Sequence, residues 1–600
     1  MCGIAGSINF GFEKIEGIVS SLYHRGPDEQ NSYSYKNINL LHTRLSIQDI
    51  AHGTQPFEYE DFVIVFNGEI YNHLELRERY LEDFVFKTLS DTETLLYLHI
   101  KYKNKMFDMI DGMFAFCILD KKQNKLILAR DRAGKKPLYI YKKDDKIVFA
   151  SELNGIRSVV DELQIDKEAI SSYLRVGLFY GRYTPYLDIK ELEASSWCEI
   201  DISSLNIETF RYFDIKDCYK TKQDISFEDA LQKTDELLHK SIKDRLMSSD
   251  LEVGAFLSGG IDSSLIVAIA SQYKQNLKSF TVRFDGVYDE SHLAQLTANK
   301  YNTQHRVIDI NIEIKKDIEK ILSNYGMPFM DSSAVPSYYV SKEAKKYVKV
   351  ILNGDGADEI FAGYRRYVPI ANNIIEVASK FSFLLGVLPL PHDKKSLYSH
   401  IYRLLSISTK KGLDFYLGAT VDIFEDIYKF EPNEILNEMQ KFILECELDG
   451  LSKQLYLDFN ILLFSDLLVK MDIATMSHSI EGRSPFLSKY MLEFAPTLPE
   501  NYKINKKTTK FVLRELAKRY LPQQLISQPK RGFEVPLKSW VDNELCDEIY
   551  GSLSGDSYSA EFVDKTFIKQ LLNKEISVSD EKRAKMLWDM YCLEVWRKNI

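Results

Sequence analysis

A chain of 600 residues is too long for a single hydrophobic core and long enough for two or more domains. Hydrophobic residues make up 45% of it and charged residues 27%, a balance that argues against extensive disorder or a coiled coil. The formal net charge of −10 leaves no general basic surface for phosphate backbones, so we expect a fully folded protein without a nucleic-acid partner.

The most apolar segment, residues 381–390, is far shorter than the roughly 20 residues that cross a bilayer, and Pro389 interrupts it. We interpret it as the buried end of a helix and expect no membrane partner. No basic start followed by an apolar run opens the chain, which predicts no secretory signal and a cytoplasmic protein. The seven cysteines include no CxxC pair, which fits neither a disulfide framework nor a zinc site.

The N-terminal third of the chain carries short alternating or apolar runs, such as 62–66 and 125–129, between turns rich in Gly, Asn and Asp. This pattern predicts stacked sheets with some helices. From Ser226 onward apolar residues recur at helical spacing, and Ser226 with Asp229 resembles a helix capping box.

The C-terminal part has a different pattern. Apolar runs at 251–257 and 349–352 alternate with helical segments, which is typical of a parallel sheet wrapped by helices in an α/β fold. We therefore predict an N-terminal domain at 2–210, a linker at 211–225 and a C-terminal domain at 226–600.

Cys2 carries the first candidate chemistry. Removal of Met1 would leave Cys2 with both a thiol and a free α-amine. The amine titrates near about 8 and the thiol near about 8.5, so the amine can accept the thiol proton without a dedicated histidine. Taken alone, the residue is more often an arbitrary N-terminal cysteine, and the segments that follow decide the interpretation.

Five short segments follow Cys2 in order, each in a turn-like context: 24–28 (HRGPD), 44–47 (RLSI), 55–56 (QP), 67–72 (NGEIYN) and 90–93 (SDTE). Together they resemble the glutaminase domain of the N-terminal-nucleophile amidotransferases, in the asparagine synthetase branch. The resemblance implies an αββα sandwich. It continues through 111–116, 130–134, 136–139 and 149–153, which we interpret as scaffold and interdomain segments.

The resemblance also implies a role for each glutaminase residue. Asn67 and the N–H of Gly68 would form an oxyanion hole for the tetrahedral intermediate. Arg44 would hold the α-carboxylate of glutamine, and Glu69 and Asp91 would hold its α-ammonium. These residue types agree with the implied ligand, because a zwitterionic amino acid needs a cation at one end and carboxylates at the other.

A glycine-rich loop, residues 258–264 (SGGIDSS), follows an apolar run and precedes a helical segment. Glycines let the backbone approach phosphate oxygens, and a helix N-terminus supplies positive potential. No Gly-Lys-Ser/Thr follows, so it is not a Walker A loop. The loop resembles that of enzymes which cleave ATP between the α and β phosphates, and this implies Mg²⁺ at Asp262.

Residues 279–282 (SFTV), 353–359 (NGDGADE) and 361–364 (FAGY) are similar to further segments of asparagine synthetase. They imply a doubly wound parallel sheet of the adenine nucleotide alpha hydrolase type. The implied ATP-binding residues are Leu257, Ser258, Gly259, Gly260, Asp262, Ser263, Ser264, Val282, Asn353 and Gly354.

Three more residues receive roles from the same resemblance. Asp358 would join the metal site, Asp355 would lie near the activated carboxylate, and Lys510 would neutralise phosphate charge during adenylation. The sequence also departs from the pattern: residue 355 is Asp where many asparagine synthetases carry Glu, and Ile473 and Ser488 stand where we expect Arg and Asp. Residues 530–533 (KRGF) match one branch of the family.

These features predict a glutamine-dependent asparagine synthetase that uses glutamine, aspartate and ATP with Mg²⁺, and that passes ammonia internally from Cys2 to the second site. The closest rival has the same machinery but amidates another acid, such as a uronic acid sugar; the acid that promotes pyrophosphate release separates the two. A non-catalytic glutamine or nucleotide sensor has little need for a nucleophile and metal ligands together, and a ring-closing synthetase with an inactive glutaminase domain is disfavoured by Cys2. Neither the acceptor nor the oligomeric state follows from the sequence, which is compatible with a homodimer.

Overall fold

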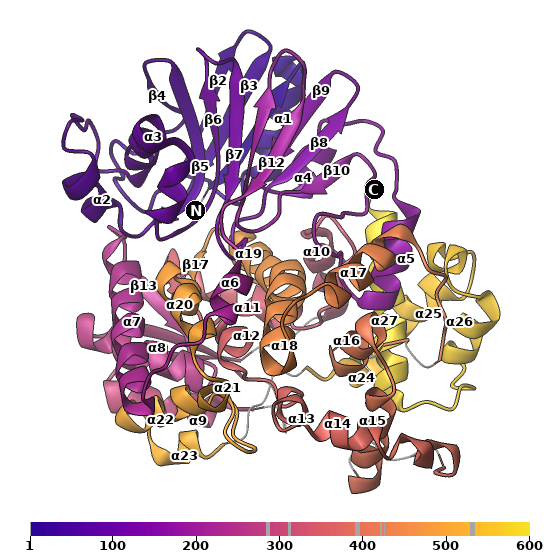
Figure 1. Ribbon diagram of the computed structural model, residues 1–600. Coiled ribbons are helices and arrows are strands. Elements are labelled where there is room, and N and C mark those ends of the chain that lie inside the picture. The colour runs from indigo at the N-terminus through magenta and orange to yellow at the C-terminus, as the bar shows by residue number, and fades with distance from the viewer. Residues whose placement is uncertain are drawn as a thin grey trace.

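The computed structural model describes residues 2–283, 289–309, 314–389, 396–420, 423–424, 427–528 and 535–600 (Figure 1). Two antiparallel sheets form the N-terminal part, and one parallel sheet lies at the centre of the C-terminal part. The N-terminal part stands on the C-terminal part, so the two share a broad junction.

The N-terminal sheets each have six strands, in the orders β10-β8-β9-β1-β3-β2 and β12-β11-β7-β6-β5-β4. The predicted runs 62–66 and 125–129 lie in β5 and β7, so both are confirmed as strands. The first sheet consists of β1 (Gly3–Ile8), β2 (Glu29–Tyr35), β3 (Ile38–Arg44), β8 (Tyr139–Lys143), β9 (Lys146–Ala150) and β10 (Ile189–Glu191). The second consists of β4 (Phe57–Tyr59), β5 (Phe62–Ile70), β6 (Gly112–Asp120), β7 (Lys125–Arg130), β11 (Ser196–Asp201) and β12 (Ile207–Arg211).

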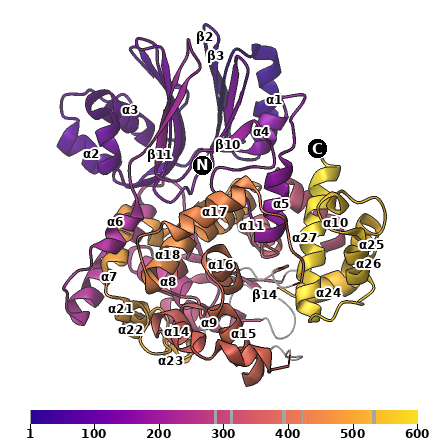
Figure 2. The same ribbon diagram turned by 45° about the vertical axis from the view of Figure 1, so that its right-hand side comes forward.

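Alternation along the strands explains why the sheets stack. In β5, Val63 and Val65 belong to the apolar core between the sheets, whereas Ile64 and Phe66 belong to the core under the outer helices. Figure 2 shows the resulting layers, with helices outside both sheets. The outer helices are α1 (Phe12–Leu22) and α4 (Leu153–Arg157) on one side, and α2 (His73–Tyr80) and α3 (Asp91–Tyr102) on the other. The predicted αββα sandwich is confirmed.

The C-terminal sheet is parallel, with the strand order β15-β14-β13-β16-β17. From β13 the chain adds β14 and then β15 on one side, and it then crosses to the other side of β13 to add β16 and β17. The strand order therefore reverses between β13 and β16. Ligands in such sheets bind outside the carboxyl ends of the strands at this reversal. The strands are β13 (Val253–Phe256), β14 (Lys278–Arg283), β15 (Gln304–Asp309), β16 (Val350–Leu352) and β17 (Glu481–Arg483).

Helices cover both faces of this sheet, which confirms the doubly wound architecture. Val350 and Leu352 pack in the core that includes α8, and Ile351 packs on the opposite face with α11. The helices that contact its strands are α8 (Ile261–Tyr273), α9 (Ser291–Tyr301), α11 (Ala334–Ala344) and α19 (Leu468–Met476), and α7 (Phe227–Met247) and α22 (Phe511–Tyr520) pack on α8. Others include α5 (Lys167–Val176), α10 (Ile314–Ser323), α12 (Ala357–Phe361), α16 (Gly412–Thr420), α17 (Glu434–Leu444), α18 (Gly450–Asp458), α20 (Lys489–Phe494), α25 (Cys546–Leu553), α26 (Lys565–Leu572) and α27 (Asp580–Lys598).

The helix start predicted at Ser226 is confirmed. The Ser226 Oγ accepts a hydrogen bond of 3.1 Å from the N–H of Asp229 and so caps α7. Within the range predicted as a linker the chain forms a short helix, α6 (Ile215–Lys220).

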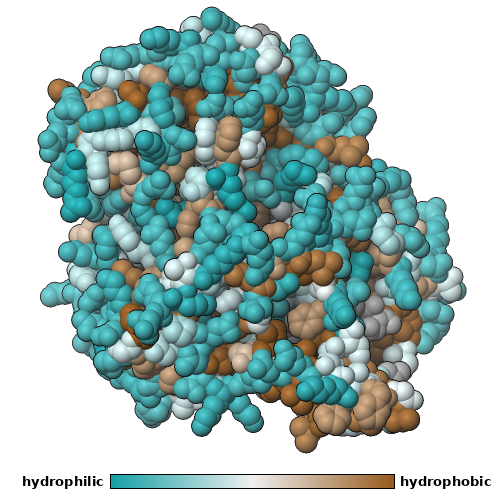
Figure 3. Space-filling model, viewed as in Figure 1, coloured by the Kyte–Doolittle hydropathy of each residue, from teal (hydrophilic) through white to brown (hydrophobic). Residues whose placement is uncertain are grey.

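The prediction that residues 381–390 form a buried helix end was wrong. This part of the chain is a 3₁₀ turn, Ser382–Gly386, and Phe381, Phe383 and Val387 are 50%, 71% and 78% exposed. The turn packs on α15 (Leu397–Ser408), which packs in turn on α14 (Ile374–Ser379). Apolar surface gathers at these elements, at the lower right of Figure 3. These short elements pack mainly on one another and do not cover the side chains of Phe381, Phe383 and Val387, which remain exposed to water. Among the described residues no helix combines the length and apolar character that crossing a bilayer requires.

Two segments of the sequence analysis reach beyond the described residues. The segment 530–533, which matches one branch of the family, lies outside them, as does Leu390 at the end of the apolar segment.

A buried ion network joins the two parts of the chain. The Asp472 carboxylate, on α19, accepts hydrogen bonds from the Arg25 guanidinium at 2.8 Å and from the Lys136 ammonium at 2.9 Å. Arg25 also donates to Glu152 at 2.6 Å. Burial alone would raise the pKa of the Asp472 carboxyl, but the charges of Arg25 and Lys136 hold it well below its usual range. The junction therefore depends on this carboxylate remaining charged.

Asp472→Asn should strongly destabilise the protein, because it leaves two buried cations with one carboxylate fewer. Breaking a buried pair in this way costs about 3–5 kcal/mol. The matched control is Asp161→Asn, which removes the partner of Lys14 from an exposed ion pair. Thermal and urea unfolding midpoints should fall clearly for the first variant and stay near wild type for the second. Equal midpoints for the two variants would show that the network does not hold the junction together.

Candidate active sites

Cys2 lies at the start of β1, in the middle of the first sheet, and is buried at the junction. Its N–H donates to the Asn67 Oδ1 at 3.1 Å, and its carbonyl oxygen accepts from the Arg25 Nε at 3.1 Å. Burial raises the pKa of the Cys2 thiol, so the thiol needs a proton acceptor to become a nucleophile.

Asn67 and Gly68 lie side by side in β5, next to Cys2. The Asn67 Nδ2 is buried and has no hydrogen-bond partner in the part of the chain that the structure describes. A Cβ at Gly68 would stand 2.1 Å from the carbonyl oxygen of Met113 on β6, so only glycine fits there. The structure thus brings Cys2, Asn67 and Gly68 together, with an amide donor available for a ligand oxygen.

The predicted glutamine-binding charges surround this centre and already have protein partners. The Arg44 guanidinium donates to Glu29 at 3.1 Å and to the carbonyl oxygen of Asp49 at 2.7 Å. The Asp91 carboxylate accepts from the N–H of Ile70 at 2.8 Å, and burial raises the pKa of Asp91 to about 6.

Glu69 has a partner that the sequence did not reveal. Its Oε2 accepts from the Arg483 guanidinium on β17 at 3.1 Å, whereas its Oε1 is buried with no partner among the residues described. Burial raises the pKa of Glu69 well above its usual range, and the neighbouring charge of Asp91 raises it further. Arg483 also donates to Glu481 at 2.6 Å. The sequence analysis gave Arg483 no role.

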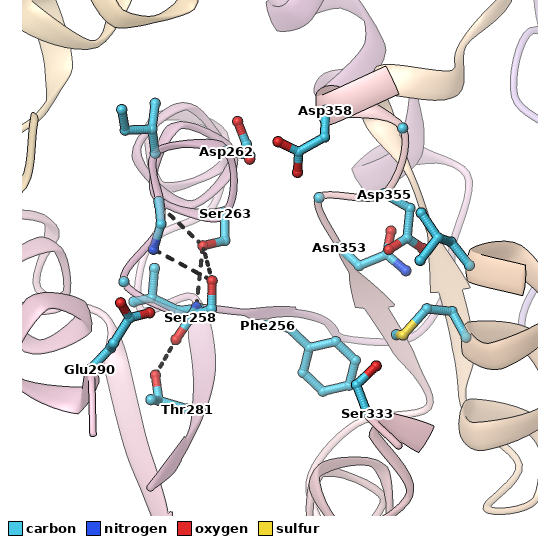
Figure 4. Close-up of a pocket in the computed structure, with 18 of the residues that line it drawn as sticks. Phe256, Ser258, Asp262, Ser263, Thr281, Glu290, Ser333, Asn353, Asp355 and Asp358 are labelled. Atoms are coloured by element: carbon cyan, nitrogen blue, oxygen red, sulfur yellow. Dashed lines mark hydrogen bonds between the residues drawn. The ribbon is translucent and has the colours of Figure 1, made fainter. Parts of the chain in front are cut away.

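A second site opens where the strand order of the parallel sheet reverses. A cavity of about 300 Å³ lies between the loop after β13 and the loop after β16 (Figure 4). Of the predicted residues, its walls include Leu257, Ser258, Gly259, Gly260, Asp262, Ser263, Val282, Asn353, Gly354, Asp355, Asp358 and Lys510. Ser264 differs from the prediction: it is fully buried on α8 and not part of the wall, because one further helical step turns its side chain into the core.

The loop after β13 has the geometry of an anion site. Gly259 has a φ of +79°, in the region that glycine adopts without strain. The N–H of Ser258 donates to the Ser263 Oγ at 3.2 Å, which ties the loop to the first turn of α8. The loop therefore faces the cavity with the N-terminus of a 13-residue helix and its positive potential.

Across the cavity, Asp262 and Asp358 face each other in Figure 4. The Lys510 ammonium lies 2.5 Å from the Asp262 Oδ2 and 2.7 Å from the Asp358 Oδ1. The other oxygen of Asp262, Oδ1, is buried without a hydrogen-bond partner in the described chain. This donor set fits Mg²⁺, a hard cation that takes one or two carboxylates and completes its shell with phosphate and water oxygens.

At the inner end of the cavity, Asp355 lies near Ser484 and Lys470, which the sequence analysis did not single out. The Asp355 Oδ2 accepts from the Ser484 Oγ at 3.3 Å, and the Lys470 ammonium donates to Asp331 at 2.8 Å and to the Ser333 Oγ at 2.9 Å. Burial raises the pKa of Asp355, although nearby lysines oppose the shift.

The two departures at 473 and 488 lie outside the cavity wall. Ile473 is a buried apolar residue of α19, and the Ser488 Oγ accepts from the N–H of Met491 and caps α20. Ile473 therefore contributes to core packing, and Ser488 stabilises the start of α20.

Comparison with known proteins relates both parts of the chain to characterised families. Residues 233–598 match the family described as asparagine synthase, and residues 1–213 match the glutamine amidotransferase domain. The glutamine-hydrolysing asparagine synthetase 1 of Bacillus subtilis is 32% identical over 631 residues, covering 99% of this chain and 96% of that protein. Asparagine synthetase 3 of the same bacterium is 28% identical and covers 89% of this chain and 87% of its own length. A solved structure of glutamine phosphoribosylpyrophosphate amidotransferase from B. subtilis matches with a TM-score of 0.28 and 18% identity, covering 48% of this chain and 68% of that one.

Gly363→Ala should selectively impair the second site. A Cβ at Gly363 would stand 1.7 Å from the Asp358 Oδ1 and 2.3 Å from the Lys510 Cε, so both side chains must shift. Nucleotide binding, measured by calorimetry, should weaken, while glutamine hydrolysis stays at the wild-type rate. The control is Gly551→Ala, where a Cβ meets nothing within 4 Å. Wild-type nucleotide affinity in the Gly363 variant would mean that the positions of Asp358 and Lys510 do not matter for binding.

Proposed function

Because the chain belongs to the asparagine synthase family, we propose that it transfers the amide nitrogen of glutamine to the side-chain carboxylate of aspartate. ATP is consumed, and the products are asparagine, glutamate, AMP and pyrophosphate. The observation that carries the proposal is the pairing in one chain of Cys2 beside the Asn67 amide with a glycine-rich loop at the strand reversal.

In the glutaminase reaction the Cys2 thiol attacks the amide carbon of glutamine. After removal of Met1, the α-amine of Cys2 accepts the thiol proton. The Asn67 Nδ2, which lacks a protein acceptor among the described residues, and the N–H of Gly68 stabilise the oxyanion. Ammonia leaves, and water hydrolyses the resulting thioester to glutamate.

Charge complementarity positions the glutamine. Arg44 binds the α-carboxylate, and the buried carboxylates of Glu69 and Asp91 bind the α-ammonium. Burial raises the pKa of both carboxyls, and neighbouring carboxylates add to the shift; the incoming ammonium group supplies a cation that favours their charged forms.

In the synthetase reaction a carboxylate oxygen of aspartate attacks the α-phosphorus of ATP, and pyrophosphate leaves. The loop at 258–263 and the N-terminus of α8 bind the phosphates, and Lys510 neutralises charge on the departing group. Asp262 and Asp358 would hold Mg²⁺, which supplies further charge neutralisation at the pyrophosphate. Asp355 lies at the inner end of the cavity, where the acyl adenylate reacts with ammonia.

Cys2→Ala should abolish glutamine hydrolysis, because it removes the nucleophile while the N-terminal sheets remain packed. Asparagine formation from ammonium salts should persist, since the second site is intact. Release of glutamate and asparagine is measured with and without ammonium, and the control is Cys546→Ala at an exposed cysteine. Retained hydrolysis in the Cys2 variant would remove Cys2 from the mechanism.

In the presence of Mg²⁺ and aspartate, ATP should be split to AMP and pyrophosphate, and chelation of the metal should stop the reaction. Asp262→Asn should reduce this activity by roughly 10²-fold or more, because it weakens the metal site and the phosphate contacts. The control is Asp556→Asn, at a carboxylate that pairs only with exposed Lys565 in the described structure.

Two outcomes would contradict the account in different ways. ADP and phosphate as products would mean that the loop at 258–264 is misinterpreted. Pyrophosphate release that responds to a uronic acid or its nucleotide conjugate, and not to aspartate, would replace the acceptor and leave the ammonia-transfer mechanism in place.

A further inference from the structure

A small inner cavity lies between the two sites. Its volume is about 10 Å³, enough for a single water-sized molecule, and ammonia has that size. Lys135 and Lys136 enter it from the N-terminal part, and Asp472 lines it from α19. Asn353 and Asp355 line both this cavity and the cavity of about 300 Å³ at the glycine-rich loop, which we call the nucleotide cavity. The two cavities therefore share one wall. In Figure 4 these two residues lie side by side across the nucleotide cavity from the glycine-rich loop.

Lys135 is held rigidly at this wall. Its N–H donates to the Asp131 carboxylate at 2.9 Å, as do the N–H groups of two neighbouring residues. Its Nζ donates to the Ser484 Oγ on the C-terminal side of the junction. Ser484 in turn lies 2.5 Å from the Asn353 Oδ1 and 3.3 Å from the Asp355 Oδ2. Through Ser484, the Lys135 side chain of the N-terminal part is therefore connected to Asp355, which we place next to the acyl adenylate.

The surroundings of Lys135 favour its neutral form. Burial lowers the pKa of the Lys135 ammonium to about 7; Lys136 and Arg245 act in the same direction, and Asp355 and Asp131 oppose it. Asp472, which also lines the cavity, is already bound to Arg25 and Lys136. Above neutral pH the amine therefore carries a lone pair beside the single-molecule cavity.

We propose that Lys135 is the base that accepts a proton from ammonia as it attacks the acyl adenylate, a role that rests on the function proposed above. The nitrogen lone pair of ammonia forms the C–N bond, and the bond from the acyl carbon to the phosphate oxygen breaks, so AMP leaves with that electron pair. One N–H proton of the attacking nitrogen passes to the neutral Lys135 Nζ. The proton returns to solvent through the nucleotide cavity when the products leave.

The test uses the full chain and two variants, Lys135→Met and Lys135→Arg. The readout is the ratio of asparagine to glutamate formed from glutamine between about pH 6 and pH 8.5, which cancels the pH dependence of the glutaminase. In the wild type this ratio should rise with pH through about 7, as Lys135 loses its proton. In both variants it should be at least roughly tenfold lower and independent of pH, because neither side chain accepts a proton in this range.

A second measurement on the same samples separates this role from a structural one. Aspartate-dependent exchange between ATP and pyrophosphate requires a folded second site but no ammonia, so it should stay within about twofold of wild type in both variants. The matched control is Lys349→Met, since Lys349 bridges the two parts of the chain through exposed Asp28 at 2.9 Å. It should keep the wild-type ratio and pH profile.

Two results would overturn the proposal. One is a wild-type ratio and pH profile in Lys135→Met. The other is recovery of the ratio in Lys135→Arg, which would mean that a fixed positive charge suffices. Failure of the proposed function gives a different result, because the wild type itself would then form no asparagine.

Discussion

Both sites depend on the buried ion pairs that the Asp472 carboxylate forms with Arg25 and Lys136, two cations from the N-terminal part of the chain. Arg25 binds Asp472 and also donates to the carbonyl oxygen of Cys2. Lys136 binds the other oxygen of Asp472 and adjoins Lys135 at the inner cavity. The same ion network therefore sets the position of Cys2, the proposed nucleophile, and the wall of the proposed acceptor site. A buried network of this kind has a large desolvation cost, so its value lies in fixed geometry more than in net stability.

A second contact crosses the junction at the glutamine site. Arg483, on the edge strand of the parallel sheet, binds Glu69, which we assign to the α-ammonium of glutamine. Binding of that ammonium changes the charge that Arg483 faces, and Arg483 also holds Glu481 and the Ser248 Oγ in the C-terminal part. Arg483 therefore links the proposed glutamine site to side chains of the C-terminal part through hydrogen bonds.

Much of the fold and the local chemistry could be predicted from the sequence. The loop at 258–264 is determined by neighbouring residues, since glycines follow an apolar strand and precede a helix, and the strands at 62–66 and 125–129 have their own alternation. What could not be predicted depends on pairs of residues far apart in the chain. The partnership of Glu69 with Arg483 spans 414 positions, and that of Lys135 with Ser484 spans 349. The apolar composition of residues 381–390 did not predict their exposure, because apolar side chains are buried only where another part of the chain covers them.

We infer that ammonia passes inside the protein from Cys2 to the nucleotide cavity. To test this, the enzyme is given glutamine labelled with ¹⁵N in its amide, together with aspartate, ATP, Mg²⁺ and an excess of unlabelled ammonium. The ¹⁵N content of the asparagine that forms is then determined by mass spectrometry. Internal transfer predicts asparagine that keeps the ¹⁵N enrichment of the glutamine amide despite the excess. Asparagine diluted to the enrichment of the bulk ammonium would contradict the account, because the nitrogen would then have passed through solvent.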